Sequence, residues 1–118
     1  MILDRNPAAL QRLHRIGGAT LVYQIVQLFL EHHPQRLATA LDGGKSGDWK
    51  AVEAAVHSMK SSAGNLGLTG LQERAARLEF LAGQGGGSEA ATILQEIADA
   101  YPGVRSLLQN LELGPVHA

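Results

Sequence analysis

The spacing of apolar residues is the feature that most restricts the fold of this chain. Apolar side chains recur at steps of three and four residues along most of the 118 residues, and no segment alternates apolar and polar side chains over the length of a strand. Aromatic residues, which strands favour, make up only 4% of the chain. Steps of three and four place side chains on one face of an α-helix. The sequence therefore predicts an all-α fold.

Glycine clusters divide the chain into five such segments. The clusters are Gly17-Gly18, Gly43-Gly44, the stretch from Gly67 to Gly70, and Gly85 to Gly87. The first segment opens with Asn6-Pro7, an N-cap residue followed by a proline at the first helical position, and predicts a short helix ending at the first glycine pair. The second predicts a helix over about 19–41, with a kink or break near His32-His33 because Pro34 follows them.

The third and fourth segments have recognisable starts. Asp48 is a good N-cap for a helix that runs to about Leu66. Thr69 and Gln72 fit a capping box at the start of a helix that runs to about Ala82. Both segments are long enough to contribute a full face to a hydrophobic core.

The fifth segment opens at Ser88 and contains Pro102-Gly103, a pair that normally ends a helix. Its apolar residues nevertheless keep steps of three and four across this pair, so that both halves face the same core. These residues are Leu94, Ile97, Tyr101, Val104, Leu108 and Leu111. We therefore predict one long, kinked helix.

Four substantial amphipathic helices with short loops pack most simply as an antiparallel up-down four-helix bundle, and the short N-terminal helix would cap one end. A chain of 118 residues suits a single domain. We expect its core within about residues 6–112 and a frayed tail at 113–118.

Composition excludes several classes of function. The net charge of −1, from 10 basic and 11 acidic residues, argues against a nucleic-acid or anionic-membrane binder. The absence of cysteine excludes disulfides, thiolate metal sites and cysteine nucleophiles. The longest apolar stretch, Ala19 to Leu30, is too short and too polar to span a membrane, and the N-terminus does not resemble a signal peptide. We expect a cytoplasmic protein.

One histidine lies away from the apolar face of its helix. At about 100° per residue, the apolar residues of the third segment cluster within roughly 80°. They are Val52, Val56, Met59, Ala63 and Leu66. His57 lies about 140° from the centre of this stripe, which predicts an exposed ring. The small residues from Ser61 to Gly64 follow it, although glycine inside a helix costs about 1 kcal/mol relative to alanine. Such a face keeps space clear for a partner.

The run from His57 to Gly67, HSMKSSAGNLG, closely resembles the phosphorylation motif of histidine-containing phosphotransfer (HPt) domains of two-component phosphorelays. The resemblance rests on the histidine, on Lys60 three residues later, on the small residues after it, and on glycine ten residues past the histidine. In layout it covers about residues 10–110, and HPt domains are four-helix bundles of this size.

The resemblance implies a phosphocarrier without kinase activity of its own. His57 would be the phosphoacceptor, Lys60 would stabilise the phosphoryl charge, and Ser61 and Gly64 would give a partner access. Ser61 stands where the family often has glycine. Glu79 stands 22 positions after the histidine, where the family often has glutamine or glutamate, and could orient the imidazole. An ion pair with Lys60 across helices is an equally good explanation of Glu79.

The partners implied are receiver domains of response regulators and a hybrid sensor histidine kinase. The chain would take a phosphoryl group from an aspartyl phosphate of one receiver and pass it to another. It would need no cofactor of its own, since Mg²⁺ would belong to the receiver. We expect a monomer whose docking patch includes exposed apolar side chains of the first two helices.

Two other functions are considered. A metal-binding bundle would use His14, His32, His33 and His57, but the Glu-x-x-His motif of two-metal bundles is missing. A helical adaptor without phosphotransfer would have the same fold and is not excluded by the sequence.

Overall fold

Four helices account for most of residues 1–111, the part of the chain that the computed structural model describes. They are α1 (Ala8–Ser46), α2 (Trp49–Asn65), α3 (Thr69–Gly83) and α4 (Ser88–Gln109). No strand occurs in these 111 residues, which confirms the all-α prediction. The tail predicted at 113–118 lies outside the described residues.

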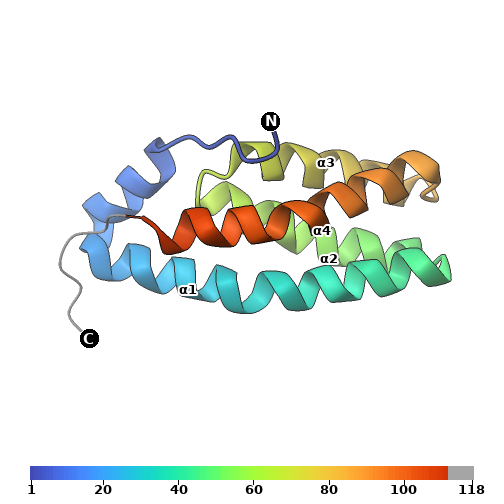
Figure 1. The fold of residues 1–118 in the computed structure, drawn as a ribbon, viewed down its shortest axis with the longest axis horizontal. Coiled ribbons are helices and arrows are strands. Elements are labelled where there is room, and N and C mark those ends of the chain that lie inside the picture. Colours follow the sequence, from blue (N-terminus) through green and yellow to red (C-terminus); the bar gives the residue numbers. More distant parts are fainter. Residues whose placement is uncertain (112–118) are drawn as a thin grey trace.

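The helices form an antiparallel, up-down bundle (Figure 1). Each helix contacts its two neighbours around a ring, in the order α1, α2, α3, α4 and back to α1. The connections are short, as the glycine clusters suggested, and span residues 47–48, 66–68 and 84–87. Between residues 1 and 111 the structure contains no helix that is both long and apolar enough to cross a membrane.

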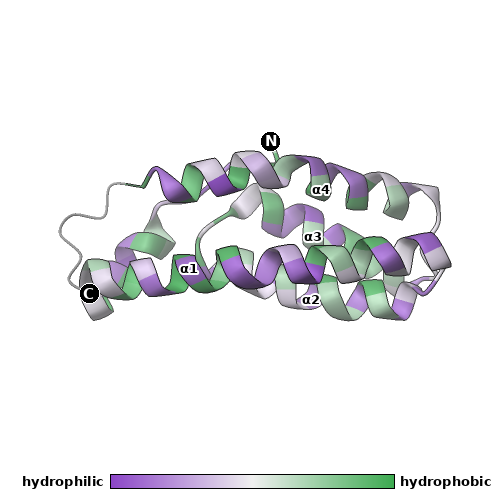
Figure 2. Cartoon of the chain, turned by 60° about the horizontal axis from the view of Figure 1, so that its bottom comes forward, coloured by the Kyte–Doolittle hydropathy of each residue, from purple (hydrophilic) through white to green (hydrophobic). Residues whose placement is uncertain are grey.

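One continuous core fills the centre of the bundle. The stripe predicted on α2 is completely buried, and four of the six predicted positions on α4 are buried with the other two packed against them. Figure 2 shows apolar positions recurring between polar ones along the helices. The bundle is therefore held together by the faces that the periodicity identified.

The predicted short N-terminal helix is present as the first part of α1. Gly18 interrupts the helix with a φ of 71° and a ψ of −168°, a conformation open to glycine but costly for other residues. The predicted start is off by one residue: Pro7 is the N-cap and Ala8 the first helical residue, although the Asn6 side chain accepts a hydrogen bond from the Ala8 amide. The short helix before Gly18 turns away from the bundle axis (Figure 1).

The second segment departs from its prediction in two respects. Of the kink or break predicted near His32-His33 the break is absent, and the helix continues through Gly43-Gly44 to Ser46 instead of ending at about Leu41. Proline leaves the Leu30 carbonyl without its helical donor, but the Tyr101 hydroxyl of α4 donates to that carbonyl at 3.5 Å. Gly43 is buried where a Cβ atom would lie 2.9 Å from the Asp48 carbonyl oxygen. The glycine here allows α1 to approach α2 closely and does not end the helix.

The predicted capping box at Thr69 is also wrong. Leu68 is the N-cap of α3, and no side chain caps this end. The Gln72 side chain lies over Gly64 of α2 instead of reaching back to the helix start. Two further predictions are confirmed. Asp48 caps α2 by accepting a hydrogen bond from the Ala51 amide, and α4 runs through Pro102 as one helix.

Candidate functional site

His57 lies near the middle of α2 with its ring directed away from the core. Its side chain is 64% exposed, whereas Met59, two residues later, is fully buried. The prediction of an exposed histidine on the polar face of the helix is confirmed. A nucleophile for an incoming macromolecule needs this accessibility.

Glu79 of α3 connects His57 to Lys60. One carboxylate oxygen, Oε2, lies 2.5 Å from Nδ1 of His57, and the other, Oε1, accepts a hydrogen bond from Nζ of Lys60. Both explanations of Glu79 that the sequence left open therefore hold at once. Arg77, two residues before Glu79, pairs with Glu89 of α4 and takes no part in this group.

The charge of Glu79 determines which nitrogen of a neutral His57 ring carries the proton. The hydrogen bond from Lys60 is the largest of the effects that lower the pKa of Glu79 below its usual value; burial opposes it, and the contact with His57 adds to it. An ionised carboxylate can only accept hydrogen bonds. The proton shared with Glu79 must therefore come from Nδ1 of His57, which leaves the lone pair of a neutral ring on Nε2.

The small residues after Lys60 differ in their surroundings. Ser61 is exposed on the same face as His57. Gly64 is half-buried, and a methyl group there would lie 2.7 Å from Nε2 of Gln72. The space beside Gly64 is thus occupied by an α3 side chain, and a role of this glycine in partner access stays a prediction.

The histidines proposed for a metal site do not converge. His33 of α1 is buried against α4: its ring centroid lies 4.7 Å from that of Phe29, in a stacked pair, and 5.2 Å from that of Tyr101, whose ring is tilted by 30°. His57 lies on the polar face of α2 beside Glu79. Within residues 1–111, no three histidine, aspartate or glutamate side chains form a group that could hold a metal ion.

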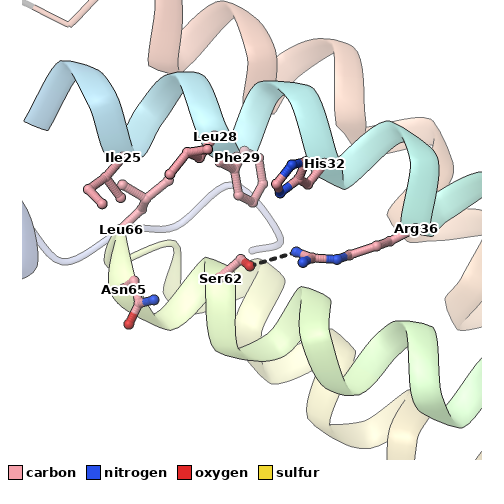
Figure 3. Close-up of a pocket in the computed structure, with 8 residues that line it drawn as sticks. All are labelled: Ile25, Leu28, Phe29, His32, Arg36, Ser62, Asn65 and Leu66. Carbon is pink, nitrogen blue, oxygen red and sulfur yellow. Dashed lines mark hydrogen bonds between the residues drawn. The ribbon is translucent and has the colours of Figure 1, made fainter.

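A hollow between α1 and α2 was not anticipated from the sequence (Figure 3). Its volume is about 180 Å³, and Nη1 of Arg36 closes one end by donating a hydrogen bond to Ser62 Oγ at 3.0 Å. The lining residues are Ile25, Leu28, Phe29, His32, Arg36, Ser62, Asn65 and Leu66. One feature of the sequence could have indicated that Arg36 faces α2: it lies seven residues after Phe29, and therefore on the same face of α1.

Comparison with known proteins agrees with this geometry. The family model described as "Hpt domain" matches residues 24–113. The crystal structure of histidine-containing phosphotransfer protein B (HptB) from Pseudomonas aeruginosa PAO1 superposes with a TM-score of 0.81 at 21% sequence identity, over 89% of this chain and 90% of that one. No curated protein matches the sequence. Since the family model spans most of the bundle and includes the exposed histidine and its two partners, the chain belongs to the Hpt domain family.

Proposed function

We propose that His57 accepts a phosphoryl group from the aspartyl phosphate of a receiver domain and passes it to the aspartate of a second receiver. Membership of the Hpt family gives the chain a phosphotransfer role in phosphorelays. The proposal adds the residue that carries the phosphoryl group and the direction of its transfer. The observation that carries it is the exposed His57 ring, whose Nδ1 is bound to the ionised Glu79.

The chemistry uses the free ring nitrogen. The lone pair of Nε2 attacks phosphorus, the Nε2–P bond forms, and the P–O bond to the receiver's aspartate breaks, which releases a carboxylate. The Nδ1 proton stays on the ring, where Glu79 balances the positive charge that the imidazole gains. Transfer to the second receiver reverses these steps with a new carboxylate as the nucleophile.

The neighbouring residues assist by charge and by size. Glu79 holds Lys60 beside His57, so its ammonium group can turn toward the phosphoryl oxygens once they arrive. Ser61 adds little bulk on the side from which a receiver approaches. Mg²⁺ would enter with the receiver, where it neutralises the phosphoryl group during in-line transfer.

The test is phosphotransfer from a panel of receiver domains carrying radiolabelled aspartyl phosphate. The unaltered chain should acquire a label that is lost in acid and stable in base, and His57→Gln should acquire none. His14→Gln changes another exposed histidine and should be labelled normally. Absence of label from every receiver would support the adaptor function, and a label on His57→Gln would place the phosphoacceptor elsewhere.

A further inference from the structure

Arg36 carries a positive charge that no carboxylate within residues 1–111 balances. Lys60, Arg74 and Arg77 each pair with a glutamate. Arg36 forms no ion pair with a carboxylate of residues 1–111; its recorded partner is the neutral Ser62 hydroxyl. Other arginines without an ion pair, such as Arg105, are exposed to water, whereas Arg36 is half-buried. Partial removal from water makes an unbalanced guanidinium a ready site for an anionic group.

Arg36 reaches α2 from the α1 side, where it binds Ser62, five residues after His57, whereas Glu79 meets His57 from α3. It lines the hollow in Figure 3 and also a second, shallower hollow on the α1–α2 surface, which includes Ala54. By helical geometry, Ala54 and Asn65 lie about 60° and 80° around α2 from His57, in the same direction. Along the axis they lie about 5 Å before it and about 12 Å after it. Along the axis of α2, one hollow therefore lies before His57 and the other lies after it.

A protein that docks over His57 and extends onto α1 would cover Arg36 as well. A specific interface buries about 800 Å² on each partner, which corresponds to a disc with a radius of about 16 Å. A disc of this size that includes His57 and extends over the α1–α2 surface would reach both hollows. Covering Arg36 with a surface that offers no acceptor would leave a desolvated and unpaired charge, which opposes binding.

We propose that Arg36 determines which receivers dock, by pairing with a carboxylate on the receiver surface while an apolar receiver side chain next to it enters the hollow. The inference rests on the proposed function and adds a recognition element on the α1 side of His57. Ile25, Leu28 and Leu66 give the hollow an apolar side against which that side chain can pack, and Leu28 is 49% exposed; His32, Ser62 and Asn65 form its polar side. Arg36 is thus a specificity residue and takes no part in the phosphoryl chemistry.

The experiment compares two phosphoryl donors on one set of variants. The first donor is a phosphorylated receiver that labels the unaltered chain, and the second is phosphoramidate, a donor too small to touch Arg36. For Arg36→Met, which keeps an unbranched apolar stem, we expect the receiver's KM to rise about tenfold with kcat unchanged. Labelling by phosphoramidate should not change. The difference should shrink at high salt, because an ion pair between surfaces is screened.

Two control variants separate recognition from structure. Arg105→Met removes an exposed arginine on α4, which does not contact α2, and should leave KM unchanged. Ser62→Ala breaks the bond to Arg36 but keeps the guanidinium, and should retain most of the docking. If Ser62→Ala raises KM as much as Arg36→Met, the arginine is structural and the inference is wrong. If Arg36→Met docks normally, only this inference fails; if no receiver labels the unaltered chain, the proposed function fails with it.

Discussion

The interface between α2 and α3 and the interface between α1 and α4 each contain a histidine. His57 is 64% exposed and bound to an ionised carboxylate, whereas His33 is 2% exposed. Neither ring nitrogen of His33 has a hydrogen-bond partner among the described residues. The first ring has a defined tautomer and a free nucleophilic nitrogen. The second ring is uncharged and packs between two other aromatic rings. The comparison shows that the neighbours, and not the residue type, decide how exposed and how hydrogen-bonded each histidine is.

The largest expected difference between His57 and His33 is in their ability to accept a phosphoryl group. His57→Gln should abolish labelling by phosphoramidate, while its free energy of unfolding should stay within about 0.5 kcal/mol of the parent, because an exposed polar side chain contributes little to stability. Labelling and urea denaturation of the same sample check both statements. A large loss of stability would mean that His57 is also structural and would remove the contrast with His33.

The second largest effect is expected in the free energy of unfolding, which should fall at acid pH because of His33. Burial, assisted by the positive charge of Arg36, lowers the pKa of His33 to about 4 from 6.5. The unfolded chain therefore binds the proton first as the pH falls. Stability from this group is complete above pH 6.5 and is lost progressively down to about pH 4, by on the order of 3 kcal/mol.

Chemical denaturation at a series of pH values checks this prediction. His33→Leu, an apolar residue of similar size, should lose less stability between pH 6.5 and 4 than the parent does. His14→Leu, at an exposed position, should keep the parental pH profile. Parallel profiles for the parent and His33→Leu would show that the buried ring is not the titrating group.

A smaller effect is expected at Glu79, where the comparison can be made sharper. Glu79→Ala removes the carboxylate that holds Nδ1 and Lys60, and should slow transfer from a receiver about tenfold, which corresponds to the loss of one charge-assisted hydrogen bond. Glu79→Gln keeps an oxygen acceptor for Nδ1, and its transfer rate should lie between the rates of the parent and of Glu79→Ala. Single-turnover rates measure the difference. Equal rates for all three proteins would show that the ring needs no orientation.

The smallest effect is expected at Gly64. Alanine improves helix propensity by up to about 1 kcal/mol, but its methyl group must displace the Gln72 amide. The two effects oppose each other, and we expect the free energy of unfolding to change by less than about 0.5 kcal/mol. In a Gln72→Ala background the displacement is absent, so the same substitution should stabilise the protein. Thermal unfolding of the four proteins makes this comparison.

The sequence predicts best what depends on local spacing. The period of apolar residues gives the four helices, and the spacing of 22 positions from His57 to Glu79 brings these two side chains together once α2 and α3 pack antiparallel. It predicts poorly what depends on a distant neighbour. Gly43 resembles a helix end until Asp48 is seen against it, and Pro34 resembles a break until Tyr101 supplies a donor to Leu30.

The same limit applies to the candidate site. The exposure of His57 follows from its angle on one helix, whereas the burial of His33 depends on the stacking of Tyr101 from α4. The bond from Arg36 to Ser62 joins residues 26 positions apart on different helices, and neither residue alone indicates it. Contacts between polar residues on different helices, such as the bond from Arg36 to Ser62, were therefore the main part of the site that the sequence could not predict.

The position of His57 between two helix interfaces has a consequence for how such a protein diversifies. Lys60 and Glu79 meet it from the α3 side, whereas Arg36 and the hollow lie on the α1 side. If His57 is the phosphoacceptor, as proposed, substitutions along α1 can accumulate without disturbing the contacts among His57, Lys60 and Glu79. A duplicated copy could acquire a new receiver, and be insulated from the old one, by changes in a single helix.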